Sequence, residues 1–221
     1  MTTGIIVAAG KSERMGVGVD KAFLPLCNKP VLAWSLLAFE RSAEISNIIL
    51  VVRKEQIVAA QALCKMFGIS KISKVIAGGK SRSESVKLAL DQCDIDVKYV
   101  IIHDGARPLV TKTMISSVAQ AVAKGPVVVG GPITDTVKTV ERNSKIVSTV
   151  DRSKLYTVQT PQAFPIKEIK QAYGKLGKAE VTDDAQVIEK AGGVVRIVET
   201  SEPNFKITTA SDLQLVAIFL K

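Results

Sequence analysis

The sequence lacks the features that mark several large classes of protein. Only 5% of its 221 residues are aromatic, and its three cysteines, Cys27, Cys64 and Cys93, form no CxxC pair. This excludes a disulfide framework or a cysteine-based zinc site, and we expect three buried thiols. No apolar run reaches the roughly 18 residues of a membrane span. Met1 to Gly4 lead into a strand-like run instead of a cationic signal peptide, so we expect a cytoplasmic protein without a membrane partner.

The charge of the chain is positive, at +9, but its lysines and arginines are scattered. Nucleic-acid binding usually needs a basic stripe with interleaved aromatic residues, and neither is visible, so we expect no nucleic-acid partner. A pocket for a polyanionic small molecule also explains the charge. With 47% hydrophobic residues the chain can bury a core, which excludes wholesale disorder.

Short apolar runs alternate with segments of helical periodicity, which predicts an α/β fold in one domain over residues 1–221. The pattern is typical of a doubly wound, mostly parallel, Rossmann-like sheet with helices on both faces. The predicted strands are Ile5–Ala9, Ile48–Val52, Lys74–Ile76, Tyr99–Ile102, Pro126–Val129 and Val194–Val198. The predicted helices are Val31–Arg41, Gln56–Phe67, Ser83–Asp91, Thr113–Ala123, Lys167–Tyr173, Thr182–Ala191 and Ser211–Phe219.

One segment departs from this alternation. From Thr136 to Val150, apolar and polar residues alternate around a polar centre, which predicts a β-hairpin within an arm over residues 134–152. A two-stranded hairpin is only marginally stable alone in water. It therefore packs either on its own domain or on a second subunit, and the pattern leaves both possibilities open.

The first predicted strand runs into a loop of small residues, Ala8 to Gly10, where exposed amides can cradle phosphate oxygens. A P-loop would need a glycine where this chain has Ile5, so P-loop hydrolysis is not expected. Arg14 and Lys21 follow the loop, and two cations beside it suit a triphosphate. Each of them alone could equally be an ordinary surface charge.

Two further loops carry chemistry. Gly78 and Gly79 lead into a helix start, which indicates either a ligand-lining loop or a turn capped by Ser83 and Glu84. Asp104 follows the strand ending at Ile102, a position where ligands bind in open α/β sheets, and is the best metal candidate. Its alternative is a pairing with Arg107. The only histidine, His103, lies in no hydrolase motif and is expected to be structural.

These strings together closely resemble the 2-C-methyl-D-erythritol 4-phosphate cytidylyltransferase family. The resemblance spans nearly the whole chain, and its weight comes from the order and spacing of several short motifs. The motifs are Ala8-Ala9-Gly10 with Arg14-Met15 and Lys21, Gly78-Gly79 with Arg82 and Ser85-Val86, His103-Asp104-Gly105-Ala106-Arg107-Pro108, Asp135-Thr136-Val137-Lys138, Val150-Asp151-Arg152, Gln159-Thr160-Pro161-Gln162, Thr182-Asp183-Asp184 and Asn204-Phe205-Lys206-Ile207-Thr208.

The resemblance implies a nucleotidyltransferase that transfers CMP from CTP to 2-C-methyl-D-erythritol 4-phosphate. Pyrophosphate leaves, and 4-diphosphocytidyl-2-C-methyl-D-erythritol forms for non-mevalonate isoprenoid synthesis. Because attack of one phosphate on another brings anions together, cations must offset their repulsion. Arg14 and Lys21 would hold the triphosphate, and Lys206 would engage the α-phosphate and the acceptor. Asp104 would help to hold Mg²⁺ or another divalent cation, and the sequence does not decide whether Glu202 joins it.

The resemblance also assigns recognition of nucleotide and acceptor. Thr136 and Arg152 look like acceptor-phosphate ligands donated by the arm of a partner subunit, which implies a homodimer with shared active sites; Arg152 counts among the catalytic cations and Arg107 among the acceptor ligands. The residues expected to bind the nucleotide are Ala8, Ala9, Gly10, Gly79, Ser85 and Gly105.

Three positions depart from the family pattern. Ser12 replaces a second glycine, Ala22 replaces a frequent glutamine, and Lys80 stands where an acid often holds the ribose. The rival readings are a cytidylyltransferase for ribitol 5-phosphate or another polyol phosphate, a nucleotide binder without turnover, and a basic nucleic-acid binder.

Overall fold

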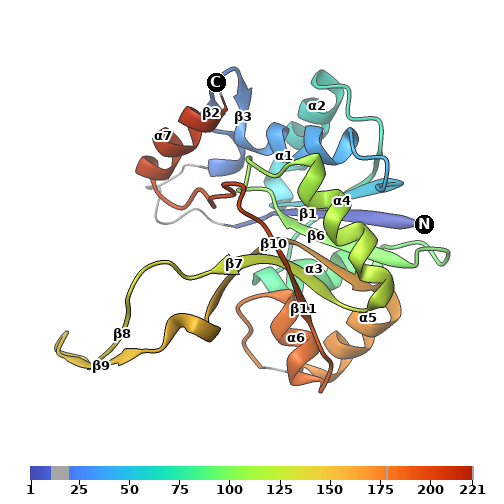
Figure 1. Cartoon of the computed structure of the whole chain (residues 1–221). Coiled ribbons are helices and arrows are strands. Elements are labelled where there is room, and N and C mark those ends of the chain that lie inside the picture. The colour runs from blue at the N-terminus through green and yellow to red at the C-terminus, as the bar shows by residue number, and fades with distance from the viewer. Residues whose placement is uncertain (11–19, 178, 221) are drawn as a thin grey trace.

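A computed structural model of the chain describes residues 1–10, 20–177 and 179–220. Its main feature is a seven-stranded sheet in the order β11-β7-β10-β6-β1-β4-β5 (Figure 1). Strand β10 is antiparallel to both of its neighbours, and every other pair in the sheet is parallel. The strands are β1 (Thr2–Ala8), β4 (Asn47–Val52), β5 (Ile72–Ala77), β6 (Tyr99–Asp104), β7 (Val127–Pro132), β10 (Tyr156–Pro165) and β11 (Arg196–Glu199).

Helices cover both faces of this sheet because neighbouring strand residues point to opposite sides. Ile6 of β1 packs in a core with α1, α2 and α4, whereas Ile5 and Val7 pack in another core with α3, α5 and α6. The predicted doubly wound α/β class is confirmed. The helices are α1 (Val31–Glu40), α2 (Ile57–Met66), α3 (Arg82–Asp91), α4 (Lys112–Ala121), α5 (Ile166–Lys175), α6 (Asp184–Lys190) and α7 (Ala210–Phe219).

Gly4 shows how closely α1 lies on the sheet. A Cβ atom at this position would stand 2.6 Å from Cδ1 of Phe39, which is fully buried at the end of α1. Only glycine accepts that approach without a shift of the aromatic ring. The glycine before the first loop therefore serves helix packing.

Strand β10 is the main difference from the predicted elements, since the sequence pattern assigned no strand there. The segment contains Pro161 between polar Thr160 and Gln162, and a proline usually argues against a central strand. The sheet accommodates it because the pairing of β10 with β7 shifts register between Val158 and Gln162. The seven predicted helices coincide with α1 to α7 to within two residues at either end.

The predicted hairpin is present as β8 (Val137–Val140) and β9 (Ile146–Val150), joined to each other and to no strand of the main sheet. It extends away from the sheet, at the lower left in Figure 1. Val140, Ile146 and Val147 are each about three-fifths exposed (61%, 59% and 59%). The hairpin thus carries apolar side chains that this chain leaves uncovered.

A third, smaller core lies beneath α7 and includes Leu26, Val31 and Val216. The short strands β2 (Pro25–Leu26) and β3 (Lys29–Pro30) bring the chain to α1. The expectation of three buried thiols is wrong for Cys27, which is exposed because it forms the β2–β3 turn with a φ of 55°; Cys93 is half-buried. Among the described residues, no helix has both the length and the apolar composition that crossing a membrane requires.

Four short 3₁₀ segments complete the secondary structure of the described residues. They are Lys21–Phe23, Lys54–Gln56, Val122–Lys124 and Arg152–Lys154. The first two lie beside the carboxyl ends of β1 and β4, where they contribute to the cavity described next.

Candidate active site

A cavity of about 760 Å³ lies beyond the carboxyl ends of β1, β4, β5 and β6. This is the edge at which open α/β sheets bind their ligands. Segments distant in the sequence meet there because parallel strands end on the same side. The lining residues are 7–10, 21–22, 53–55, 78–82, 85, 104, 106 and 206.

Two glycine-bearing loops form one wall of the cavity. A Cβ atom on Gly78 would lie 2.4 Å from Cβ of Ala9, so the loops after β1 and β5 touch only because residue 78 is glycine. Ser85 fixes the second loop: its Oγ accepts a hydrogen bond from the amide of Gly79 at 3.0 Å and donates to the Ser81 carbonyl at 2.8 Å. Five of the six predicted nucleotide-binding residues line this cavity; they are Ala8, Ala9, Gly10, Gly79 and Ser85.

The turn before α3 both caps the helix and lines the cavity. The capping residue is Ser81, not Ser83, and its Oγ accepts from the Glu84 amide at 3.1 Å. Glu84 in turn accepts from the amide of Lys80 at 2.7 Å. Lys80, which departs from the family pattern, lines the cavity.

Asp104 is the acidic centre of the cavity and is only 7% exposed. Its Oδ1 lies 2.9 Å from Nε of Arg82, and its Oδ2 lies 2.7 Å from Nζ of Lys206. Nε of Arg107 is farther away, at 3.8 Å from Oδ2. One carboxylate therefore gathers three cations, from the start of α3, from the loop after β6 and from the segment before α7.

The charge state of Asp104 follows from this setting. Burial alone would raise the pKa of its carboxyl, but Arg82, Lys206 and Arg107 lower it to a net value well below its usual range. Asp104 is therefore ionised at neutral pH.

Arg82 bridges Asp104 to a second buried carboxylate. Its Nη2 lies 2.8 Å from Oδ2 of Asp184, which is fully buried and accepts a hydrogen bond from the Tyr173 hydroxyl at 2.6 Å. Sequence reasoning quoted Arg82 in a motif but did not place it in the site. The signal was its position at a helix start after a glycine pair, whereas no local pattern reveals that Asp184 lies opposite.

Lys21 reaches the cavity from a 3₁₀ segment, Lys21–Phe23. Asp20 caps this segment by accepting from the Ala22 amide at 3.1 Å, and its Oδ2 also pairs with Nη2 of Arg53, just after β4, at 3.0 Å. Lys21 and Lys206 thus line the same cavity, as expected. Arg14, the third predicted cation, lies outside the described residues.

Four predicted site residues do not line this cavity. Gly105 packs inward, since a Cβ there would stand 2.9 Å from Leu32, and Arg107 donates from Nη1 to the Asn204 carbonyl at 2.8 Å. Thr136 and Arg152 are exposed at the two ends of the arm, where Arg152 donates to the Thr134 carbonyl. The chain does not bring its own arm to its own cavity.

His103 agrees with its structural interpretation. It is fully buried, its Nε2 lies 3.2 Å from the Arg107 carbonyl, and its Nδ1 lies 3.1 Å from Oγ1 of Thr160. Burial lowers the pKa of His103 to about 4, so the ring is neutral at physiological pH. One ring nitrogen thus holds the loop that follows β6, and the other ties the ring to β10.

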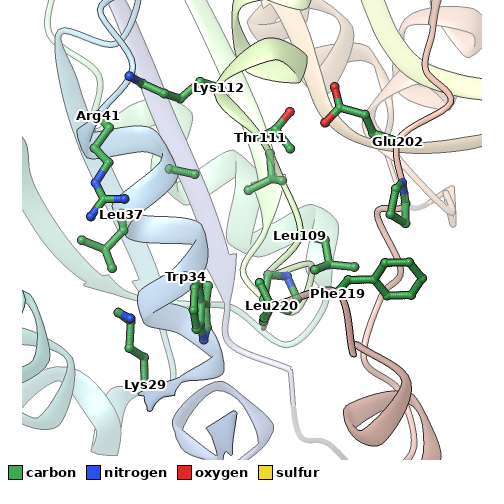
Figure 2. Close-up of a pocket in the computed structure, with 14 residues that line it drawn as sticks. Lys29, Trp34, Leu37, Arg41, Leu109, Thr111, Lys112, Glu202, Phe219 and Leu220 are labelled. Carbon is green, nitrogen blue, oxygen red and sulfur yellow. The ribbon is translucent and has the colours of Figure 1, made fainter. Parts of the chain in front are cut away.

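A second hollow, of about 440 Å³, lies between α1, the loop after β6 and α7. Figure 2 shows Trp34 and Leu37 on α1 and Phe219 on the opposite side. Glu202 lines this hollow and not the cavity of Asp104, so it does not stand as a second carboxylate there. The described residues contain no group of three or more metal-ligating side chains.

A doubly wound sheet whose strand ends carry glycine loops and converging cations defines a nucleotide-binding α/β protein. The profile of the family described as IspD, 2-C-methyl-D-erythritol 4-phosphate cytidylyltransferase, matches residues 2–221. The chain belongs to this family of nucleotidyltransferases, which act in isoprenoid biosynthesis.

Individual relatives from this family are similar to the chain over nearly its whole length. The Dehalococcoides mccartyi enzyme of that name is 42% identical over 218 residues, covering 98% of this chain and 95% of the relative. The Alkaliphilus metalliredigens enzyme is 41% identical, covering 96% and 89%. The crystal structure of the Anaerococcus prevotii 4-diphosphocytidyl-2C-methyl-D-erythritol synthase has a TM-score of 0.87 at 28% identity, covering 99% of this chain and 95% of that one.

Proposed function

We propose that this chain transfers CMP from CTP to 2-C-methyl-D-erythritol 4-phosphate and releases pyrophosphate, with 4-diphosphocytidyl-2-C-methyl-D-erythritol as the product. One observation carries the proposal. Lys21 and Lys206 line a single cavity together with Asp104 and the two glycine-bearing loops. The two lysines come from opposite ends of the chain. Membership of the family supplies the substrates.

The nucleotide lies along the two glycine-bearing loops. The backbone at Ala8 to Gly10 and at Gly79, with Ser85 behind it, is suited to line the cytosine, ribose and phosphate groups of CTP. Gly105 packs inward, and a Cβ atom on it would lie 3.2 Å from Cβ of Ala8. Gly105 therefore contributes to the site indirectly, because its lack of a side chain leaves room for Ala8. Binding is then a backbone property that few side chains determine.

The cations offset charge during the reaction. The acceptor phosphate attacks the α-phosphorus in line as the bond to pyrophosphate breaks, so negative charge builds up on the leaving oxygens. Arg14 and Lys21 hold the triphosphate, and Lys206 engages the α-phosphate and the acceptor. At an effective dielectric near 20, a unit pair about 4 Å apart contributes about 4 kcal/mol before desolvation, so a few placed cations supply a large part of the catalysis.

A divalent cation fits this site on chemical grounds. Mg²⁺ usually takes one or two carboxylates together with substrate phosphates, and Asp104, whose lowered pKa keeps it ionised at neutral pH, supplies one carboxylate lining the cavity. When bound beside Asp104, the ion would neutralise phosphate charge. Lys206 now occupies Oδ2 of this carboxylate at 2.7 Å, so it is the side chain that gives way and turns to the phosphates.

The acceptor site is completed by a second copy of the chain. Thr136 and Arg152 lie on an arm that does not reach the cavity of its own chain, and the arm exposes Val140, Ile146 and Val147. A partner subunit would cover these side chains and receive the two acceptor ligands. Arg107, held near Asp104, joins them. The chain is then one domain, 1–221, with 134–152 as its dimer arm.

A paired acceptor assay tests the proposal. Purified protein is incubated with CTP and Mg²⁺ and either 2-C-methyl-D-erythritol 4-phosphate or ribitol 5-phosphate, and pyrophosphate is measured. We expect release with the first acceptor at a kcat/KM at least about 100-fold above the second. Preference for ribitol 5-phosphate would reassign the acceptor. CTP binding without pyrophosphate release, or a salt-sensitive gel shift with oligonucleotides that CTP does not compete, would refute the enzyme.

A further inference from the structure

The buried carboxylate Asp184 stands next to the site but outside its cavity. It is the first residue of α6, its exposed fraction is 0%, and it does not line the cavity that contains Asp104 and Lys206. Any effect of Asp184 on the reaction must therefore pass through another side chain. The side chain in contact with it is Arg82, at 2.8 Å.

Asp184 is itself held from the opposite side. Its Oδ1 accepts a hydrogen bond from the Tyr173 hydroxyl of α5 at 2.6 Å, and its Oδ2 pairs with Nη2 of Arg82. Both carboxylate oxygens thus have a partner, which a buried charge requires. The carboxylate acts as a fixed anchor between α5 and α3.

This anchor determines which part of the guanidinium remains for Asp104. With Nη2 of Arg82 turned to Asp184, Arg82 meets Asp104 through Nε alone, at 2.9 Å from Oδ1. Oδ2 of Asp104 is left for Nζ of Lys206, at 2.7 Å. A guanidinium free of Asp184 could instead bind both oxygens of one carboxylate in the fork geometry that arginine prefers.

Building on the proposed function, we infer that Asp184 is a positioning residue: through Arg82 it orients the Asp104 carboxylate and keeps Oδ2 clear of the guanidinium, so that Oδ2 serves Lys206 in this structure and the divalent cation when one is bound. The opposing view is that the ion pair only ties α6 to α3. The two views predict different effects when the ion pair is lost. If Asp184 positions Arg82, the loss lowers turnover of a folded protein. If the ion pair only ties the helices together, the loss lowers stability alone.

The test compares Asp184→Asn with Val187→Ala, a matched control. Val187 is fully buried on the same helix and packs in the core away from the cavity, so its truncation weakens α6 without touching Arg82. We expect Asp184→Asn to lower kcat by about tenfold or more with the KM for CTP within about threefold of wild type. Val187→Ala should lower Tm and leave kcat at the assay temperature unchanged.

A milder variant decides the matter should Asp184→Asn fail to fold. Tyr173→Phe keeps the carboxylate and its ion pair but removes one anchor, so kcat should fall about two- to fivefold. Unchanged kcat in the folded variants, or an equal loss of kcat in Val187→Ala, overturns the inference. An inactive wild-type protein overturns the proposed function and the inference with it, whereas an active wild type with normal variants overturns only the inference.

Discussion

The strand-end cavity and the arm carry the two halves of the proposed site and are built in opposite ways. In the cavity, Asp104 is 7% exposed and is paired with cations from two other segments. On the arm, Thr136 and Arg152 are exposed, and the hairpin strands pair only with each other. The cavity is set by the fold of one chain, whereas in the proposed dimer the arm packs against a surface that another copy supplies. Substitutions in the two regions should therefore have effects that differ in kind, on kcat or on KM, as well as in size.

The largest effect is expected in the cavity. Lys21→Ala and Lys206→Ala each remove a cation that lines the cavity and is proposed to offset phosphate charge, so we expect kcat to fall by about 10²- to 10³-fold. The comparison uses steady-state rates together with circular dichroism. Lys29→Ala is the matched control, because Lys29 lies in the second hollow with its Nζ 4.3 Å from the Trp34 ring centroid. Near-normal turnover in either cavity variant would remove that lysine from the mechanism.

The arm should give a smaller effect that can be restored by mixing. Arg152→Ala is expected to raise the KM for the acceptor by about 10- to 100-fold, as loss of one charged phosphate contact would. Exchange of its subunits with Lys21→Ala subunits should restore about a quarter of the wild-type sites, because half of the random dimers are mixed and one of their two sites is intact. Each variant incubated alone is the control. An absence of restored activity after verified exchange would show that the arm serves its own chain.

The fold was largely predictable because the parallel strands are apolar runs. The runs Ile48–Val52 and Val100–Ile102 indicate buried strands from their residues alone, and every residue in them is at most 2% exposed. Strand β10 was not predicted because Pro161 and its polar neighbours argue against a strand. The strand tolerates them through a register shift in its pairing with β7, and such a shift appears only once the two strands are paired. The thiol of Cys27 was misjudged because a tight turn places it outward.

The site was predictable to the extent that its residues follow strand ends. Ala8 to Gly10, Gly79 and Asp104 line one cavity at one edge of the sheet because parallel strands terminate together, and this meeting follows from the strand pattern of the sequence. The ion pairs of Arg82 with Asp184 and of Arg53 with Asp20 were not predicted, since each joins elements whose adjacency only the folded chain determines. Gly105 was expected to face the nucleotide but packs against Leu32.

The smallest expected effect concerns the support of Lys206, which lies between β11 and α7. Asp212 completes the capping box of α7 with Thr209, and it accepts hydrogen bonds from the hydroxyl and amide of Thr208 at 2.7 and 2.8 Å. Asp212→Ala should cost about 1 kcal/mol of unfolding free energy at pH 7, as loss of a helix cap does. Turnover should stay unchanged, because Asn204 independently anchors the segment by donating to the Thr160 carbonyl at 2.7 Å.

The pH dependence of that cost identifies its source. The hydrogen bonds from Thr208 lower the pKa of Asp212 to about 2, below its ordinary value of 3.8. A carboxyl with a lowered folded-state pKa contributes stability that is fully present above its unfolded pKa and is lost as pH falls through its folded pKa. Urea denaturation of wild type and Asp212→Ala between pH 5 and pH 2.5 should therefore show the difference in unfolding free energy shrinking below pH 4. A difference that stays constant over this range would mean that packing around α7, and not the ionised cap, holds the Lys206 segment in place.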